Sequence, residues 1–77
     1  MSIYIKFSKE LYRARQRAGF TQAEVAEAVG VSKRWYQCVE RGDRLPGALV
    51  LLRLILLLHL DVEAFREEAG LIALHTA

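Results

Sequence analysis

The sequence predicts one small all-α domain of five short helices, and three observations carry this prediction. Residues that cap helices (serine, threonine, aspartate and glycine) recur along the chain, and apolar residues between them follow three- and four-residue spacing. Beyond residues 1–7, no stretch has the alternation of a strand. The chain of 77 residues is 53% hydrophobic, above the roughly 45–50% of an ordinary globular chain. We therefore expect one domain that shares part of its apolar surface with a partner.

The N-terminal segment and the first helix are predicted as separate units. Ser8 can cap a helix that runs to Ala18, where Gly19 ends it. Before this helix, "IYIKF" alternates apolar and polar residues in the manner of a strand. A lone strand is unstable, so two alternatives remain open for residues 1–7. The segment is either a short β arm that pairs with the arm of a second subunit, or it is unstructured.

The second and third helices have the clearest boundaries. "TQAE" is a capping box, so Thr21 begins a helix that Gly30 ends. Ser32 begins the third helix, which stops at Gly42. The two helices and the turn between them span about residues 22–41.

The most apolar stretch, "ALVLLRLILLLHL", predicts a fourth helix over about residues 48–58. It has 13 residues with Arg53 in its middle, whereas a bilayer crossing needs about 20, so no membrane contact is expected. Asp61 begins a fifth helix, which completes a domain over residues 8–70. The tail 71–77 carries no clear prediction.

The fourth helix is apolar nearly all round, with one stripe formed by Leu49, Leu52 and Leu56. Such a helix must be covered on nearly all sides. A second chain provides part of the cover in one alternative, which we favour. In the other, the arm and tail of the same chain cover the helix. The residues expected at a dimer interface are Leu54, Leu57, Leu58 and Leu60.

The charge distribution favours a polyanionic partner. Net charge is +2, but residues 1–44 hold nine Lys/Arg against five Asp/Glu, while residues 45–77 hold two against four. This asymmetry places the positive charge on the half that contains the second and third helices.

Enzymatic, metal-binding and cofactor-binding functions are not expected. The single cysteine, Cys38, excludes an intrachain disulfide and fits a reducing cytoplasm. His59 and His75 do not lie at metal-ligand spacing from it. No paired carboxylates, nucleophile–base pair or phosphate-cradling glycine loop is present. "MSIYIKF" lacks the features of a signal peptide.

Four residues have the spacing of a helix-turn-helix. Ala26 is small, as the crossing of two helices requires, and Gly30 tolerates the positive φ of the turn. Tyr36 and Val39 are the apolar residues of the inner face. The stretch "FTQAEVAEAVGVSKRWYQCVERG", with "ARQRAG" before it and "LPGALVLL" after it, resembles the Xre-type family of phage Cro/repressor-like helix-turn-helix domains.

The resemblance covers residues 8 to about 66. It implies a five-helix phage-repressor-like fold, sequence-specific binding to double-stranded DNA, and action as a homodimer on near-palindromic operators. It further implies that Arg15 pairs with Glu40, a partner that a carboxylate in the last turn of a helix also needs against the macrodipole. By position in the family, Lys33, Arg34 and Cys38 are base-facing, with Trp35 and Gln37 beside them, and Gln22 holds a phosphate. Ser32, Arg41 and Arg44 are further phosphate-binding candidates. The alternative for these cations, as for Lys33 and Arg34, is an ordinary solvated surface.

Three residues depart from the family pattern and keep a second function open. Cys38 stands where a long polar side chain is common, Trp35 where threonine or serine is frequent, and Tyr36 where an aliphatic residue is usual. The first hypothesis is a cytoplasmic, bacterial or phage-encoded, nucleoid-associated repressor whose third helix enters the major groove. The alternative is a protein-interaction module (an antitoxin, an antirepressor or a polymerase-binding regulator) that uses Trp35 and Tyr36 as an anchor. Neither needs a small-molecule ligand.

Overall fold

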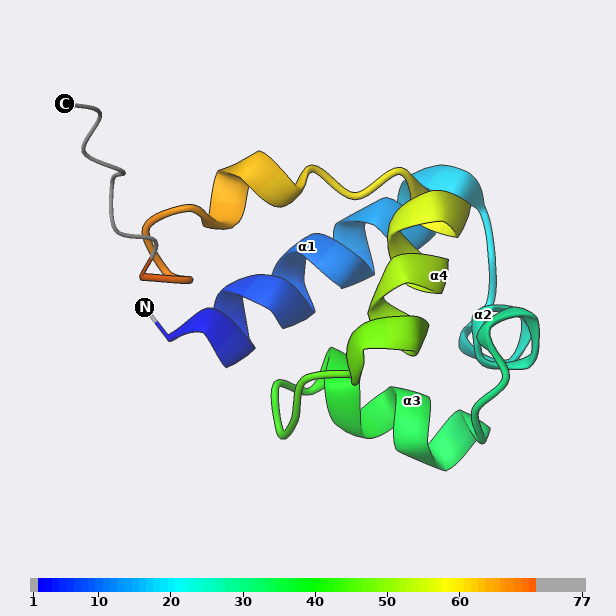
Figure 1. Ribbon diagram of the computed structural model, residues 1–77. Helices are drawn as coiled ribbons and strands as arrows, with labels where there is room; N and C mark the ends of the chain where they lie inside the picture. The colour runs from blue at the N-terminus through cyan, green and yellow to red at the C-terminus, as the bar shows by residue number, and fades with distance from the viewer. Residues whose placement is uncertain (1, 71–77) are drawn as a thin grey trace, which may run out of the picture.

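The computed structural model describes residues 2–70 as an all-helical chain (Figure 1). The elements are four α-helices and one 3-10 helix: α1 (Ile3–Ala18), α2 (Gln22–Val29), α3 (Lys33–Glu40), α4 (Ala48–Leu58) and η1 (Val62–Phe65). The all-α prediction is confirmed over this range, whereas the predicted five α-helices are four.

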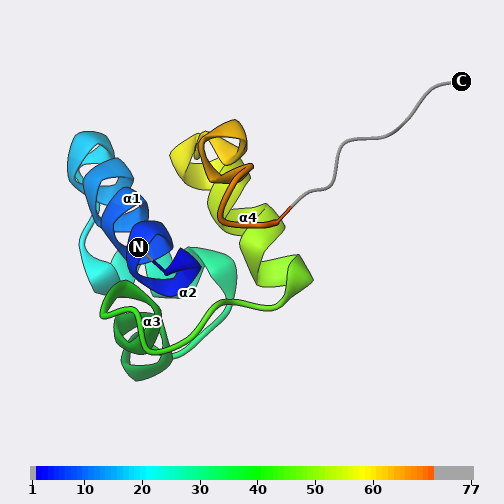
Figure 2. The same ribbon diagram turned by 90° about the vertical axis from the view of Figure 1, so that its left-hand side faces the viewer.

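α1 and α4 pack against each other, and α3 lies beneath them (Figures 1 and 2). α2 and α3 also pack together. In addition, α2 contacts α4 and α3 contacts α1. Every one of the four helices contributes to the core, which comprises Phe7, Leu11, Ala14, Val25, Ala26, Val29, Tyr36, Val39, Leu54 and Leu58.

The predicted β arm over residues 1–7 is wrong, because α1 begins at Ile3 with Ser2 as its cap. The Ser2 hydroxyl accepts a hydrogen bond from the Ile5 backbone N–H at 3.3 Å. Ser8, expected to begin the helix, lies inside it and donates to the carbonyl of Ile5 at 2.8 Å. The alternation of apolar residues suggested a strand, but burial of Phe7 requires the helical phase that also buries Leu11.

The boundaries of α2 and α3 confirm the predicted caps. Thr21 accepts from the Glu24 N–H at 3.1 Å while the Glu24 carboxylate accepts from the Thr21 N–H at 2.8 Å, which completes the capping box. Gly30 ends α2 with φ at 79°. Ser32 caps α3 by accepting from the Trp35 N–H at 3.1 Å.

The predicted fifth α-helix is a single 3-10 turn. Asp61 does cap it, accepting from the Glu63 N–H at 3.1 Å. Beyond the cap, Phe65 packs against the core, whereas Val62 is 53% exposed. Most of the stability of a helix comes from burial of one of its faces. Phe65 alone buries little surface, so a longer helix in this segment would be weakly stabilised. The tail 71–77 lies outside the described residues.

Two of the four predicted dimer-interface leucines belong to the core of the chain itself. Leu54 is 0% and Leu58 4% exposed, so the prediction that they contact a second subunit is wrong. Leu57 and Leu60 are partly buried against the same core. The exposed leucines of α4 are those of the stripe, Leu49, Leu52 and Leu56, because the core lies on the opposite side of the helix.

Gly42, just after α3, lies where α1 passes closely. Its φ is 85°, and a Cβ built there would lie 2.8 Å from Ile5 Cδ1. Replacement of Gly42 by alanine is expected to cost about 1–2 kcal/mol of unfolding free energy for the left-handed backbone, plus the displacement of Ile5. Gly19→Ala is the matched control, because φ there is 76° with nothing within 4 Å of the added Cβ. Urea unfolding compares them; equal losses would contradict the contact with Ile5.

Candidate functional site

The site is formed where the N-terminal ends of α2 and α3 meet on one side of the molecule. Each helix is fixed at this end by its own cap, Thr21 for α2 and Ser32 for α3. The turn between them is closed by the Val31 N–H, which donates to the Ala26 carbonyl at 3.0 Å. Local sequence therefore sets the direction of both helices before packing fixes the angle between them.

A buried ion pair between Arg15 and Glu40 stabilises the packing of α2 and α3. Arg15 of α1 donates from Nε to Glu40 Oε2 at 2.9 Å and from Nη2 to Glu40 Oε1 at 2.8 Å, and from Nη1 to the Phe20 carbonyl at 2.9 Å. The two side chains are only 9% and 5% exposed. The pair thus links α1, the loop before α2, and the end of α3.

The network extends from Glu40 to the surface of the site through two glutamines. Gln22 Nε2 donates to Glu40 Oε1 at 3.3 Å, and Gln37 Nε2 donates to Gln22 Oε1 at 3.1 Å. The first residue of α2 is therefore tied to the middle and the end of α3. The buried Tyr36 hydroxyl lies beside the same carboxylate without a hydrogen bond of standard geometry.

Arg15 and Glu40 both remain charged near neutral pH. Burial by itself would raise the pKa of the Glu40 carboxyl, but hydrogen bonds from Arg15 and Gln22, with the neighbouring Tyr36 hydroxyl, hold that pKa below its usual value. The hydrogen bond to Glu40 raises the pKa of Arg15, although burial opposes it. Burial, and after it the adjacent Glu40 carboxylate, raises the pKa of Tyr36. Arg15 and Glu40 are thus a charged pair, and Tyr36 is a neutral phenol.

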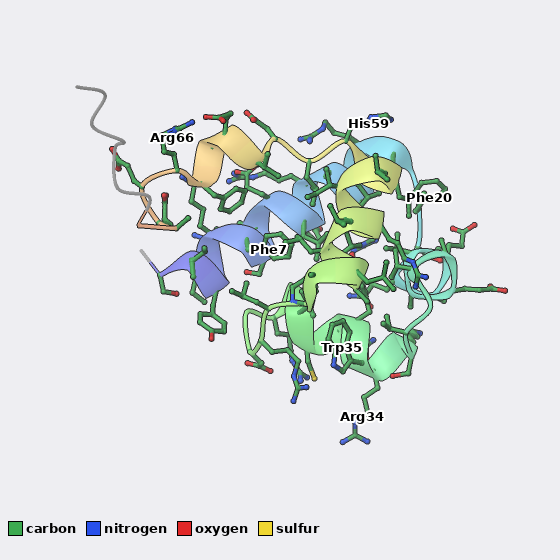
Figure 3. All side chains as sticks on the ribbon, viewed as in Figure 1. Phe7, Phe20, Arg34, Trp35, His59 and Arg66 are labelled. Carbon is green, nitrogen blue, oxygen red and sulfur yellow. The ribbon has the colours of Figure 1, made fainter. Side chains whose placement is uncertain are left out.

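Above this network, the first turn of α3 presents two free cations. Lys33 and Arg34 are exposed, and neither takes part in an ion pair among residues 2–70. Figure 3 shows Arg34 pointing away from the body of the molecule. Arg44, in the loop after α3, is likewise exposed and unpaired within this range. These three side chains give the site an uncompensated positive charge.

The other predicted base-facing residues are less available. Trp35 is partly buried and packs against the core, on a different side of α3 from Arg34 (Figure 3). Gln37 is held by Gln22, and Cys38 is half-buried with its sulfur accepting from Arg41 Nη2 at 3.3 Å. Tyr36 is 0% exposed, so the hypothesis that it anchors a protein partner is wrong.

The predicted phosphate-binding residues separate into two groups. Gln22 borders a shallow hollow of about 440 Å³ between the end of α1 and the start of α2, to which Lys33 also contributes. Ser32 is exposed, with its hydroxyl used as the α3 cap. Arg41 lies on the far end of α3 and donates from Nε to Asp43 at 3.1 Å, so its charge is largely compensated.

Sequence reasoning missed two polar residues of the hollow, Gln16 and Thr21, which line it together with Gln22 and Lys33. The sequence pattern indicates Thr21 only as a helix cap, and it gives no indication for Gln16. One other feature of the sequence does indicate that Gln16 lies near the hollow. Gly19 ends α1 in the left-handed conformation and turns the chain, so the last turn of α1 lies beside the first turn of α2.

The described residues contain no group of three side chains able to hold a metal ion. Within the same range, none of the helices has the length and apolarity that a membrane crossing requires. Exposed donors at two helix N-termini, with cations beside them, are chemically suited to bind an anion, and repeated anions along a polymer would engage Lys33, Arg34 and the hollow together.

A family model described as a helix-turn-helix domain matches residues 6–69, which is most of the chain. The family is a DNA-binding module and is typically not enzymatic, so DNA is the partner that the match indicates. No curated protein matches the sequence.

Proposed function

Because this chain belongs to the helix-turn-helix domain family, we propose that it is a repressor-like transcriptional regulator that binds a specific DNA sequence. The observation that carries the proposal is the pair of free cations, Lys33 and Arg34, on the first exposed turn of α3. α3 enters the major groove, and this turn is the part of a recognition helix that reaches base edges. The protein represses by occupying its site.

Arg34 is the residue that reads sequence. Its guanidinium presents parallel N–H donors, which match the O6 and N7 acceptors of guanine in the major groove. Lys33 has no such fork and borders the hollow at the start of α2, so it contacts phosphate instead. This division assigns specificity to one residue and sequence-independent affinity to the other.

The hollow positions the domain on the DNA backbone. A phosphate placed there meets the free backbone N–H groups of the first turn of α2, the positive end of its dipole, and Lys33. Gln22 reaches the same phosphate with the second N–H of its amide, because the first N–H is held by Glu40. Arg44 provides a further phosphate contact at the other end of α3.

The DNA site is near-palindromic, because the protein acts as a homodimer whose two α3 helices read equivalent half-sites. Such helices lie about 34 Å apart, one turn of B-DNA, so that both face the same side of the duplex. The length of the operator therefore follows from the dimer geometry.

Selection of random duplexes, followed by fluorescence-anisotropy titration at several salt concentrations, tests this function. We expect one sequence to be enriched. Arg34→Ala should then cost about 1–3 kcal/mol on that sequence and much less on unrelated DNA. Lys33→Ala should weaken binding on all sequences alike and reduce the log–log salt slope by about 1.

Arg66→Ala is the control for loss of one positive charge. Arg66 is exposed and paired with Glu63, at the opposite end of the molecule from Arg34 (Figure 3). Its removal should leave sequence preference unchanged. The proposed function fails if no sequence is enriched, or if Arg34→Ala and Arg66→Ala weaken binding to the enriched duplex equally.

A further inference from the structure

An apolar groove of about 280 Å³ lies where the first turns of α1, the start of α4 and the segment after α4 meet. All nine residues that line it are apolar; they include Phe7 of α1, Leu51 of α4 and Phe65 of η1. Phe7 is 6% exposed and belongs to the core, whereas Val62, on the outer wall, is 53% exposed. The groove is therefore an open extension of the core, away from the residues of the candidate DNA site.

Contacts with α1 hold the outer wall of the groove in place (Figure 1). The Lys6 ammonium pairs with Glu68 and donates to the Ala64 carbonyl. It also lies 5.5 Å from the centroid of the Phe65 ring, which packs against Phe7. The described residues thus form the groove before anything enters it, so an occupant would not have to create it.

The size and lining of the groove favour a short apolar peptide segment over a small molecule. Sites for drug-sized molecules have volumes of about 300–1,000 Å³ and use a few polar groups to orient the ligand. This groove is smaller, and no polar side chain lines it. Side chains that alternate along a peptide can enter such a hollow while the peptide backbone stays in water.

The chain itself continues from the edge of the groove into a segment of this kind. Ala69 lines the groove, and the sequence after Gly70 reads "LIAL" at residues 71–74. Five of the eight residues from 61 to 68 are charged, whereas these four are all apolar. Leu74 follows Ala69 by five residues, a reach of up to roughly 17 Å for an extended chain. That reach exceeds the width of a hollow of this volume.

Gly70 gives the chain the turn that such a return requires. Its φ is 68°, in the left-handed region that glycine adopts without strain. Its N–H donates to the Glu67 carbonyl at 3.0 Å, which closes the turn. A segment tethered one residue from its site also has an effective concentration on the order of millimolar. An unrelated peptide would have to compete with it.

We propose that the groove is the docking site of residues 71–74 of the same chain, with Leu71, Ile72 and Leu74 supplying the side chains that enter it. The docked segment covers apolar surface that the described residues leave open beside the core. This inference goes beyond the proposed function, because no residue of the groove belongs to the candidate DNA site.

Methyl NMR of the full chain, with leucine and isoleucine methyl groups labelled, tests the docking. We expect nuclear Overhauser effects from the Ile72 and Leu74 methyls to the rings of Phe7 and Phe65, with upfield shifts from those rings. Leu56 is the internal control, since it is 75% exposed and does not line the groove. Its methyls should show neither effect. Absence of both effects for residues 71–74 would overturn the proposal.

Val62→Glu tests whether the groove is the place of docking. Val62 is exposed, so the helices should be retained in circular dichroism while a charge enters the groove and the Overhauser effects disappear. Overhauser effects that persist in this variant would place the segment elsewhere. A mixture of labelled and unlabelled chains separates the source of the segment: effects between chains would show that a second copy, and not the same chain, occupies the groove.

Replacement of the segment provides a second readout in the full chain. With Leu71→Ser, Ile72→Ser and Leu74→Ser combined, the groove should open and the fluorescence of 8-anilinonaphthalene-1-sulfonate, which binds exposed apolar surface, should rise. Leu49→Ser, Leu52→Ser and Leu56→Ser combined is the control, because these leucines are exposed outside the groove. That variant should show no rise. An equal response of the two variants would contradict the docking, whatever the outcome for DNA binding.

Discussion

Arg15→Ala is expected to lower the free energy of unfolding by about 3–5 kcal/mol, because it leaves the Glu40 carboxylate buried without its cation. A domain of this size has roughly 4–12 kcal/mol in total, so the variant should be close to unfolding at ordinary temperatures. Urea denaturation of the two proteins at neutral pH measures the difference.

A surface ion pair on the same helix provides the matched control. Arg13 pairs with Glu10 at 3.1 Å, but these side chains are 62% and 34% exposed. Water screens such a pair, and its removal typically costs less than about 1 kcal/mol. If Arg13→Ala and Arg15→Ala have similar effects, the buried pair does not hold the domain together.

The same pair gives the stability a predictable dependence on pH. The pKa of Glu40 is lower in the folded chain than in the unfolded chain, where a glutamate titrates near about 4.3. The unfolded state therefore takes up the proton first as the pH falls. The stabilisation is complete above that value and is lost as the pH falls through the lower, folded-state pKa.

Glu40→Gln removes this titration, so the stability difference between the natural chain and this variant should be largest near neutral pH and should shrink in acid. Urea unfolding of both at a series of pH values measures it. A difference that stays constant from neutral pH down through the acid range would show that Glu40 does not act through its charge.

Leu54→Ala is expected to cost about 2–5 kcal/mol of unfolding free energy, because Leu54 is 0% exposed and its loss leaves a cavity between α4 and the other helices. This loss belongs to the protomer, so it should be the same at every protein concentration. Thermal and urea unfolding over a concentration series measure it.

Leu56→Ala is the comparison on the other side of the same helix. Leu56 is 75% exposed, so its truncation removes little buried surface and should change the unfolding free energy by less than about 0.5 kcal/mol. If Leu54→Ala and Leu56→Ala lower the unfolding free energy equally, the division of α4 into a core side and an exposed side is wrong.

The helices with strong local signals could be predicted from sequence alone. Gly19 marks the end of the first helix, Thr21 and Gly30 the two ends of the second, and Ser32 the start of the third, through hydrogen bonds that span only a few residues. The start of α1 is locally ambiguous, because Ser2 and Ser8 can both cap a helix and the alternation in "IYIKF" also fits a strand. The helix from Ile3 buries Phe7 with Leu11 and places Phe7 against Phe65, with ring centroids 5.9 Å apart.

The candidate site was also predictable only in part from the sequence. Its residue types and their positions on two helices follow from the helix-turn-helix spacing. Which of these side chains stay free does not, because it depends on partners distant in sequence: Glu40 holds Gln22, Gln22 holds Gln37, and the core holds Trp35. Only Lys33, Arg34 and Arg44 remain unpaired at the site within the described part of the chain.

The sequence by itself determined that this chain is helical, that two of its helices form the turn motif, and that α4 is apolar nearly all round. Only the tertiary structure decided which side of α4 is buried in the core. Composition is nearly uniform around α4, so periodicity has no preferred face to indicate. The contacts with α1 and α2 select Leu54 and Leu58, and they leave Leu49, Leu52 and Leu56 outside.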